Sequence, residues 1–488
     1  MKKNWNKIMA VGGLILCAGL ATGGMGVDPL SALAADEGIV LDSDNFPDSV
    51  FLKFVSDNYD TNRNGILDTE EIQAAKTLTF SAMPEGGVKD EDSEEDIPEA
   101  RKYLDIEGIQ YLEALTTVDL SGWYLNHAGK VKELLKLENL SLDYDDLDSI
   151  DITDLKKLKT FRATYNNLEK MDLSANKNLT VINLDHNQLK ELKLKDHSKL
   201  KELTCTKNRI RQLDLSSLKR LEILYADSNA MKTLKLPNTS TVKELSLEDN
   251  KLKNISLSKY KALTCCKMES NPLKRIDVSS NPKLKVLCVS GDRIDKLDIS
   301  KNKKLNYLSC RDTSCKKIMV SHLKNLETLI CSDNDLDILD ISKNEKLKRL
   351  ECQNVRLAKL DVSSNYDLVY LDCSNNILEK LNVSMCNELE YLDCNSNNIK
   401  KLNLGTQTQL KYLFCYSNQM TSLDLSGCTA LDIMNIDEFQ VHEDTYYGSD
   451  DTTVRKIFLP HSVYTDRFTL EEIRSYLSID CVYTNYTA

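Results

Sequence analysis

The chain has 488 residues, of which 41% are hydrophobic and 28% are charged, and its formal net charge is −12. This length could hold two or three ordinary domains. The negative charge argues against nucleic acid as a partner, because nucleic-acid binding needs a basic surface.

The first 34 residues have the pattern of a signal peptide. Three lysines precede an apolar run over 8–20, and Ala32-Leu33-Ala34 has the small-x-small form of a cleavage site. No later segment approaches the roughly 20 apolar residues that a membrane-spanning helix needs. We therefore expect an exported, extracellular protein without a transmembrane segment.

Residues 35–84 contain the one motif with explicit ligand chemistry. Residues 60–71 match the twelve-residue calcium loop of an EF-hand, and apolar spacing over 47–58 and 69–76 predicts flanking helices. The oxygen ligands would come from Asp60, Asn62, Asn64, the Ile66 carbonyl, Asp68 and Glu71. We expect one structural Ca²⁺ ion in a small EF-hand-like helical cap. The alternative is a turn that binds no ion.

Three carboxylates and no second loop predict a modest affinity, suited to extracellular calcium near about 10⁻³ M. Acidic residues are concentrated in this part of the chain, and they continue into residues 85–100. That stretch is predicted to be a solvated, flexible loop.

From Leu137 to Leu431 the chain repeats every 21 residues without insertion or deletion. One turn reads L-x-x-L-x-C-x-x-N-x-L-x-x-L-D-[LIV]-S-x-x-x-x, and only Val242 departs from leucine at the first position. A period of 20–29 residues with this spacing is typical of a leucine-rich repeat solenoid, whose turns must stack to bury their apolar sides. We predict an α+β, mainly β fold in which residues 101–440 form a curved solenoid, with about 16 parallel strands on the concave face.

Two further positions of the repeat predict how its bends are held. The ninth is Asn in most turns, and a buried amide there can satisfy backbone groups of its own bend and of a neighbouring turn. Asp292, Thr313 and Val355 interrupt this series, so we expect looser bends at these turns. The seventeenth is mostly Ser or Thr, whose hydroxyl can bond the turn's own backbone.

The sixth position is cysteine in six consecutive turns. These residues are Cys310, Cys331, Cys352, Cys373, Cys394 and Cys415. Side chains on parallel strands keep their Cβ atoms about 4.8 Å apart, whereas a disulfide needs ~3.8 Å, so we expect stacked free thiols rather than bridges. No histidine occupies the column, and one line of side chains cannot surround a tetrahedral metal ion.

This cysteine column and the sequence over 371–376 resemble the cysteine-ladder branch of the internalins, leucine-rich surface proteins of Gram-positive bacteria. The resemblance covers about residues 115–440. It implies a curved solenoid at a bacterial cell surface, or secreted, that serves as a binding or adhesion module. Such scaffolds host many partners, so the resemblance is far more specific for fold than for function.

Outward positions of the concave strands are the expected binding face. Tyrosines recur at the third position, acids line the fifth, and aromatic residues lie beside the last of them: Tyr307, Tyr370, Tyr391, Tyr412, Asp372, Asp393, Phe414 and Tyr416. An exposed aromatic column rimmed by acids suits a protein or carbohydrate ligand, because tyrosine combines a large rigid area with a polar tip. The alternative is that the tyrosines only stabilise adjacent strands.

Catalysis is not expected. The six histidines have no recurrent relation to a Ser, Cys or acid, and Cys265 and Cys288 have no histidine on their own or adjacent concave strands. A secreted hydrolase or thiol enzyme is therefore a less favoured alternative, as is a purely structural envelope protein. We expect a monomer.

Residues 441–488 leave the repeat register and are predicted to cap the open end of the solenoid. Val454–Leu459 could add a strand, and Thr469 opens a capping-box pattern for a short helix to about Leu477. Such a lid protects the last strand from edge pairing.

Overall fold

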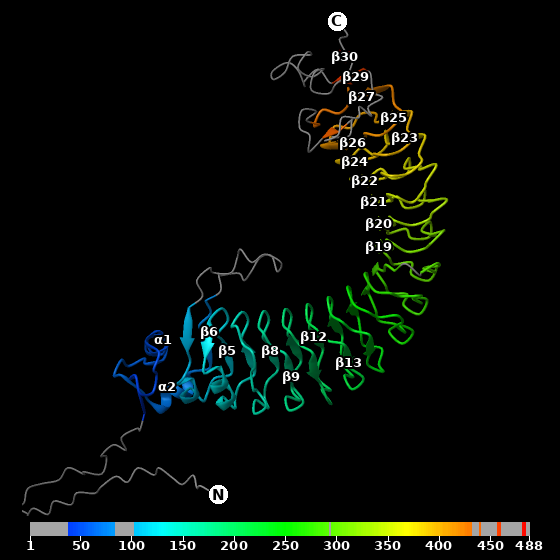
Figure 1. Ribbon diagram of the computed structural model, residues 1–488. Coiled ribbons are helices and arrows are strands. Elements are labelled where there is room, and N and C mark those ends of the chain that lie inside the picture. Colours follow the sequence, from blue (N-terminus) through cyan, green and yellow to red (C-terminus); the bar gives the residue numbers. More distant parts are fainter. Residues whose placement is uncertain are drawn as a thin grey trace, which may run out of the picture.

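The computed structural model is one long curved arc with a small helical cap at its N-terminal end (Figure 1). The structure describes residues 38–82, 102–291, 294–431, 439–440, 456–459 and 481–484. The predicted signal peptide at 1–34, the acidic loop at 85–100 and the predicted helix at 469–477 lie outside the described residues.

The cap contains two helices and a two-stranded antiparallel ribbon. Helix α1 (Ser49–Tyr59) begins after Asp48, whose carboxylate accepts the Val50 N–H at 2.8 Å, and α2 (Thr69–Ala74) begins after Asp68. Strand β1 (Ile39–Val40) pairs with β2 (Ile66–Leu67) inside the motif at 60–71. Helices therefore occur at both places where the apolar spacing predicted them.

One sheet of seventeen strands follows the arc from β3 to β28. Its strands are β3 (Thr77–Thr79), β5 (Thr117–Asp119), β7 (Asn139–Ser141), β8 (Thr160–Arg162), β10 (Val181–Asn183), β12 (Glu202–Thr204), β14 (Ile223–Tyr225), β16 (Glu244–Ser246), β17 (Cys265–Lys267), β18 (Val286–Cys288), β19 (Tyr307–Ser309), β20 (Thr328–Ile330), β21 (Arg349–Glu351), β22 (Tyr370–Asp372), β24 (Tyr391–Asp393), β26 (Tyr412–Phe414) and β28 (Phe439–Gln440).

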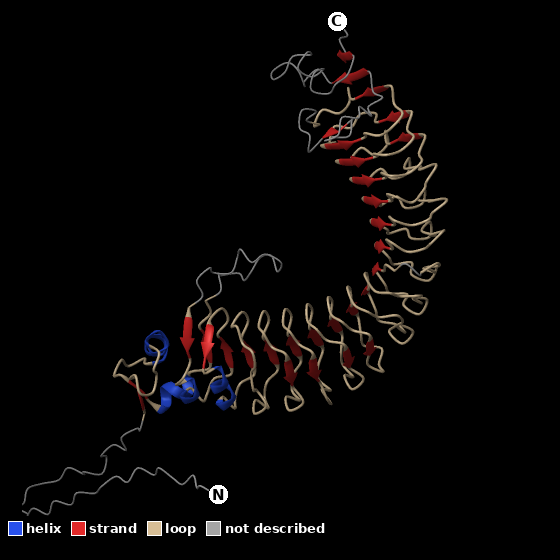
Figure 2. Ribbon diagram, in the orientation of Figure 1, coloured by secondary structure: helices blue, strands red, loops and turns tan. Residues whose placement is uncertain are grey.

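All neighbours in this sheet pair in parallel, and from β7 to β26 each residue faces the one 21 positions later, as in Tyr370↔Tyr391. The sheet lies on the inner side of the arc along its C-terminal half (Figure 2). The predicted fold, a mainly β leucine-rich repeat solenoid, is confirmed.

Shorter strand pairs form a second line of contacts between turns. They are β4 (Tyr103–Asp105) with β6 (Tyr124–Asn126), β9 (Lys170–Asp172) with β11 (Glu191–Lys193), β13 (Gln212–Asp214) with β15 (Thr233–Lys235), β23 (Lys380–Asn382) with β25 (Lys401–Asn403), and β27 (Ser422–Asp424) with β29 (Lys456–Leu459) and β30 (Cys481–Thr484). Two 3₁₀ helices, η2 (Ile109–Tyr111) and η3 (Ala128–Glu133), complete the first turns. Strand β29 falls where the C-terminal strand was predicted.

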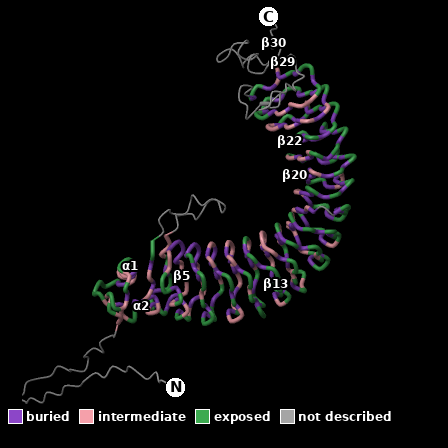
Figure 3. Tube along the Cα trace, in the orientation of Figure 1, coloured by how far each residue is buried: buried purple, intermediate pink, exposed green. Residues whose placement is uncertain are grey.

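The core runs continuously along the arc because every turn contributes the same apolar positions. The leucines at the first and fourth positions and the residues at the sixth are almost all fully buried, as at Leu368, Leu371 and Cys373. Figure 3 shows this buried strip passing from turn to turn while the outer loops stay exposed.

The asparagines at the ninth position bind backbone groups of two turns, as predicted. Asn376 donates from Nδ2 to the carbonyls of Cys352 at 2.8 Å and Cys373 at 3.0 Å, and its Oδ1 accepts the Leu357 N–H at 2.9 Å. Where Thr313 replaces the asparagine, its hydroxyl still donates to the Cys310 carbonyl at 3.2 Å. Asp292 lies outside the described residues.

A second amide column, which the sequence analysis missed, lies at the nineteenth position. Asn344 is fully buried, and its Nδ2 donates to the carbonyls of Val320 at 3.0 Å and Leu323 at 2.8 Å, both in the preceding turn. Asn176, Asn281, Asn302, Asn365 and Gln407 occupy the same place in their turns. Cys386 substitutes for the amide, with its thiol 3.7 Å from the Val362 carbonyl.

The cysteine column consists of free, buried thiols among the described residues. Cys310 and Cys331 each direct Sγ to a carbonyl of the following turn, at 3.6 and 3.5 Å. Burial raises the pKa of every thiol in the column, so these groups stay neutral and act as small apolar side chains.

Candidate ligand-binding face

Three tyrosines of successive strands form an aromatic column on the concave face. The rings of Tyr370 and Tyr391 are stacked at 4.2 Å with an interplanar angle of 6°. Tyr412 continues the series at 6.0 Å and 40° from Tyr391, and Phe414 lies 5.6 Å from the same ring. We call these four residues the aromatic column. Tyr412, at its C-terminal end, is 38% exposed.

Arg349 extends the column by one strand and was not among the predicted residues. Its guanidinium carbon lies 3.7 Å above the centroid of the Tyr370 ring, and its Nη2 is 2.6 Å from Glu351 Oε1. A cation on a tyrosine face with a carboxylate beside it is a favourable arrangement. The signal was available in the sequence, since Arg349 occupies the same repeat position as the tyrosines.

Asp372 and Asp393 face each other across β22 and β24 beside the column. Asp372 Oδ1 accepts the Ser374 N–H at 3.0 Å, and Asp393 Oδ1 accepts the Asn395 N–H at 3.0 Å. Within the described part of the chain, no donor reaches Oδ2 of either carboxylate and neither forms an ion pair.

Burial raises the pKa of the Asp393 carboxyl to about 7, and the neighbouring Asp372 adds to that rise. Burial also raises the pKa of Asp372, against the lowering effect of its hydrogen bonds from Ser374. Arg349 lowers the pKa of Asp372 through its charge, but its ion pair is with Glu351, so two half-buried acids one strand apart remain costly to ionise together.

The remaining predicted residues of this face lie further from the column. Tyr307 is in the same register, but Thr328 and Arg349 separate it from Tyr370, so it does not stack there. Tyr416 follows β26, and its backbone N–H donates to Asn395 Oδ1 at 2.9 Å. The structure thus groups Tyr370, Tyr391, Tyr412 and Phe414 and leaves Tyr307 apart.

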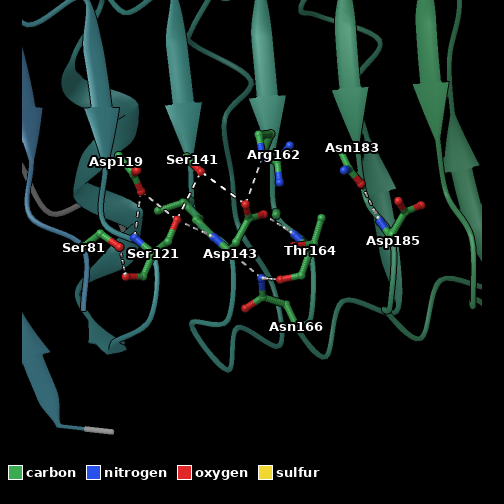
Figure 4. Close-up of polar contacts among 12 residues, drawn as sticks. Ser81, Asp119, Ser121, Ser141, Asp143, Arg162, Thr164, Asn166, Asn183 and Asp185 are labelled. Atoms are coloured by element: carbon green, nitrogen blue, oxygen red, sulfur yellow. Dashed lines mark hydrogen bonds and ion pairs between the residues drawn. The ribbon is translucent and has the colours of Figure 1, made fainter. Parts of the chain in front are cut away.

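The N-terminal turns carry a polar network in which Asp143 is paired with Arg162 (Figure 4). Asp143 accepts the Thr164 N–H at 2.7 Å through Oδ1, and Arg162 Nε donates to its Oδ2 at 3.0 Å. Ser121 Oγ donates to Asp119 Oδ1 at 2.7 Å and lies 3.1 Å from Ser141 Oγ. Asp143 is therefore paired with a cation of the chain itself, in contrast to Asp372 and Asp393, whereas the Asp119 carboxylate accepts hydrogen bonds only from Ser121 among the described residues.

A second aromatic stack, also missed from the sequence, lies at the eighth position of these early turns. The rings of Tyr144 and Tyr165 are 4.2 Å apart, and His186 lies 3.8 Å from Tyr165. All three have positive φ, a conformation that bulky residues rarely adopt. Tyr144 is buried against the turn, which leaves less of this stack available to a ligand than of the aromatic column.

Asp145 is a carboxylic acid at the ninth position of its turn, where most other turns have asparagine. Its Oδ1 accepts the N–H groups of Gly122 at 2.9 Å and Trp123 at 3.1 Å, while its buried Oδ2 has no donor. Burial raises its pKa to about 9, despite those two hydrogen bonds. The group is therefore protonated at neutral pH, and its buried Oδ2 accepts no hydrogen bond from the described residues.

Neither concave thiol has the properties of a nucleophile. Cys288 is buried, and burial raises its pKa to about 12; burial also raises the pKa of Cys265. Because the thiolate is the reactive form, both groups are inert at neutral pH.

The loop at 60–71 has hydrogen bonds that close it around its own carboxylates. Asp60 accepts the N–H groups of Asn64 at 3.1 Å and Gly65 at 3.0 Å, and Gly65 has φ 79°. Glu71 accepts the N–H of Thr61 at 2.7 Å. The pKa of Glu71 is lowered, because its hydrogen bonds outweigh the opposing effect of burial.

Asp60 and Glu71 are both buried, at 7% and 6% exposure, and the amide of Asn62 reaches Asp68 Oδ2 at 3.1 Å. Among the described residues, no three His, Cys, Asp or Glu side chains come close enough to form a metal cluster. The predicted ligands surround one region of the loop, but Glu71 points to the backbone of Thr61 and would have to turn to bind an ion.

A polar recess of about 1030 Å³ lies at the edge of the turns between Glu269 and Arg356. Its arginines are paired, Arg311 with Asp333 and Arg356 with Asp335, each at 2.8 Å. The two arginines of the recess are therefore neutralised by the chain itself.

Solved structures resemble a large part of the arc. A functional domain of InlJ from Listeria monocytogenes, which includes a cysteine ladder, has a TM-score of 0.53 at 23% identity and covers 81% of this chain and 74% of its own. A leucine-rich repeat protein of Leptospira interrogans has a TM-score of 0.56 at 23% identity, covering 64% of this chain and 86% of its own. The PEPR1–AtPEP1 complex has a TM-score of 0.52 at 16% identity, covering 79% and 61%.

These likenesses establish the leucine-rich repeat fold. No protein-family model and no curated protein matches the sequence. In the described ranges, no helix is both long and apolar enough to cross a membrane.

Proposed function

We propose that this chain is an exported recognition protein of the bacterial cell surface or its surroundings, and that it binds a protein partner on the C-terminal half of its concave face. The single observation that carries the proposal is the aromatic column, flanked by two acids that the chain leaves unpaired. Rigid aromatic groups with polar tips concentrate binding energy at protein interfaces. The raised pKa values of Cys265 and Cys288 on the concave strands favour a binding rather than a catalytic role.

A protein partner fits this face better than a carbohydrate. Stacking on a sugar needs an open aromatic face, but Tyr370 is covered by Arg349 on one side and Tyr391 on the other. Tyr370, Tyr391 and Phe414 are only partly exposed, and Tyr412 at the end of the column is the exposed ring. Such a surface accepts side chains and backbone groups of an extended peptide.

The test is a screen of displayed random peptides and of a glycan array with wild-type protein and the Tyr370→Ala/Tyr391→Ala/Tyr412→Ala variant. The matched control is Tyr103→Ala/Tyr124→Ala, which removes another pair of neighbouring rings, 5.2 Å apart, near the cap. We expect peptides that bind wild type and control but not the triple variant, with an unchanged far-UV spectrum. Equal binding by all three proteins would reject this face as the site, and a triple variant that melts early with no ligand found would favour the structural role of the tyrosines.

We also propose that the cap holds one Ca²⁺ ion in the loop at 60–71, with a structural role. The support is the order of oxygen-bearing residues, the buried carboxylates of Asp60 and Glu71, and the bend at Gly65. The ion would fix the ribbon of β1 and β2 and so the cap that precedes β3, the first strand of the main sheet.

A further inference from the structure

The chain itself shows which group the aromatic column accepts. Arg349 places its guanidinium on the face of Tyr370, and Glu351 in the same strand neutralises it. This arrangement uses the third and fifth positions of one turn and the third position of the next. Because residues 21 positions apart pair along the sheet, the equivalent three positions recur in each following turn.

In the next two turns the acid and the ring are present but the cation is not. Asp372 and Asp393 take the place of Glu351, and Tyr391 and Tyr412 take the place of Tyr370. Tyrosines rather than arginines stand at the third position of these turns. Each acid therefore has a ring in the next strand and an Oδ2 that no described group satisfies.

The basic residues nearby do not fill this gap. Lys348 is paired with Glu327 at 3.2 Å, and Lys411 with Glu390 at 3.0 Å, both on the rim of the strands. Arg349 lowers the pKa of Asp372 through its charge but is itself paired with Glu351, so the local charge beside the column is negative and a cationic ligand complements it.

We infer that the partner presents arginine side chains to this face, which pair with Asp372 and Asp393, and that the guanidinium at Asp393 lies against the exposed ring of Tyr412. Arginine fits better than lysine, because its planar guanidinium can stack on a ring and bond a carboxylate at the same time. This inference rests on the proposed function and adds the chemical class of the ligand to it.

Titration of the acids should be coupled to binding. The groups that face them are Arg349 and Glu351 on β21, Tyr370 on β22, Tyr391 on β24 and Phe414 on β26. The pKa of Asp393 is raised to about 7 by burial and by Asp372, so the acid is mostly protonated at pH 6 and mostly ionised at pH 8. If an arginine pairs with the ionised form, its affinity rises by up to about tenfold over this interval.

The experiment uses the full chain and an octapeptide of alternating glycine and arginine, measured by calorimetry at pH 6 and pH 8. The comparison peptides replace arginine by citrulline, which has the same shape without the charge, or by lysine. We expect citrulline to weaken binding at least tenfold, lysine to weaken it several-fold, and the arginine peptide to bind more tightly at pH 8.

The variant is Asp372→Asn/Asp393→Asn, and its matched control is Asp340→Asn/Asp361→Asn, which removes the same charge at exposed positions outside the concave strands. The first should lose at least tenfold in affinity and the second should bind as wild type. Equal binding of the arginine and citrulline peptides, or an equal loss of affinity in both variants, would overturn the inference that arginine is the ligand. The proposal that the aromatic column binds a protein would still stand. An arginine peptide that binds the triple tyrosine variant as well as wild type would instead reject the proposed function.

Discussion

Replacing Asp145 by asparagine should stabilise the protein, and increasingly so as pH rises. Asn166 in the next turn shows the arrangement that asparagine adopts: its Nδ2 donates to the Leu142 carbonyl at 2.7 Å and its Oδ1 accepts the Leu147 N–H at 2.8 Å. Asp145 accepts the Gly122 and Trp123 N–H groups through Oδ1, but its buried Oδ2 has no donor among the described residues, so the ionised carboxylate is costly.

The sign and size of this effect on the free energy of unfolding follow from the pKa of Asp145 in the folded and in the unfolded chain. The pKa of Asp145 is about 9 in the folded chain, through burial, and about 3.9 when unfolded. Because the folded value is the higher one, its contribution to stability is complete below about pH 4 and is lost as pH rises toward 9. At about 1.4 kcal/mol per pH unit, the loss is on the order of 1.5 kcal/mol at pH 5 and 4 kcal/mol at pH 7.

Asparagine carries its hydrogens at every pH, so Asp145→Asn should recover most of that loss. Urea unfolding at pH 5 and pH 7 measures the global effect, and hydrogen exchange of the Gly122 and Trp123 amides measures it locally. The matched control Asp143→Asn removes a buried acid of the same region that pairs with Arg162, and it should destabilise at both pH values. A variant that is less stable than wild type at pH 7, or whose advantage does not grow from pH 5 to pH 7, would refute the reasoning.

Three further outcomes are expected. Asn376→Ala should lower the free energy of unfolding in urea by about 2–4 kcal/mol, because it leaves buried carbonyls of two turns without a donor. A decrease below about 1 kcal/mol would contradict the stabilising role of the ninth-position asparagines. Cys373→Ser should destabilise the protein by about 1–3 kcal/mol. Adding a reducing agent should leave the melting temperature of the wild type unchanged, and a lower melting temperature would reveal a disulfide. Calcium at about 1 mM should raise the melting temperature of wild type but not of Asp60→Ala/Glu71→Ala, and indifference of wild type to chelator would show that the loop is empty.

The repeat made the fold predictable almost completely. A period of 21 residues without insertions places the concave strands and their buried leucines by counting, and the structure has Tyr370 opposite Tyr391 as that count requires. Side-chain alternation likewise placed the cysteines inside and the tyrosines outside, because both periodicities are fixed by the backbone.

What the sequence did not disclose depends on side-chain conformation and on single departures from the repeat. The guanidinium of Arg349 lies on Tyr370 through a choice of rotamer that spacing does not determine. The hydroxyls at the seventeenth position were expected to bond backbone, but Ser342 Oγ donates to Asp340 Oδ1 at 2.7 Å, because that carboxylate is nearer and charged. Asp145 differs from asparagine only in carrying an oxygen instead of the amide NH₂ group. That oxygen cannot donate a hydrogen bond unless it is protonated.

The cap shows a different limit. Its loop was predicted from the order of ligand types, but the partner of the β2 strand was not, because β1 consists of only two residues and carries no loop motif of its own. Glu71 is also directed toward backbone N–H groups of the loop, a choice that depends on the conformation of a flexible side chain.

Hydroxyl-radical footprinting of the protein with a selected peptide tests the binding face most directly, since it reports the solvent access of individual tyrosines. Binding on the concave face predicts that Tyr412 is protected, with smaller protection of Tyr370 and Tyr391, while Tyr103 near the cap stays reactive. Protection confined to Tyr103, or to the early stack of Tyr144 and Tyr165, would place the partner elsewhere and contradict the account.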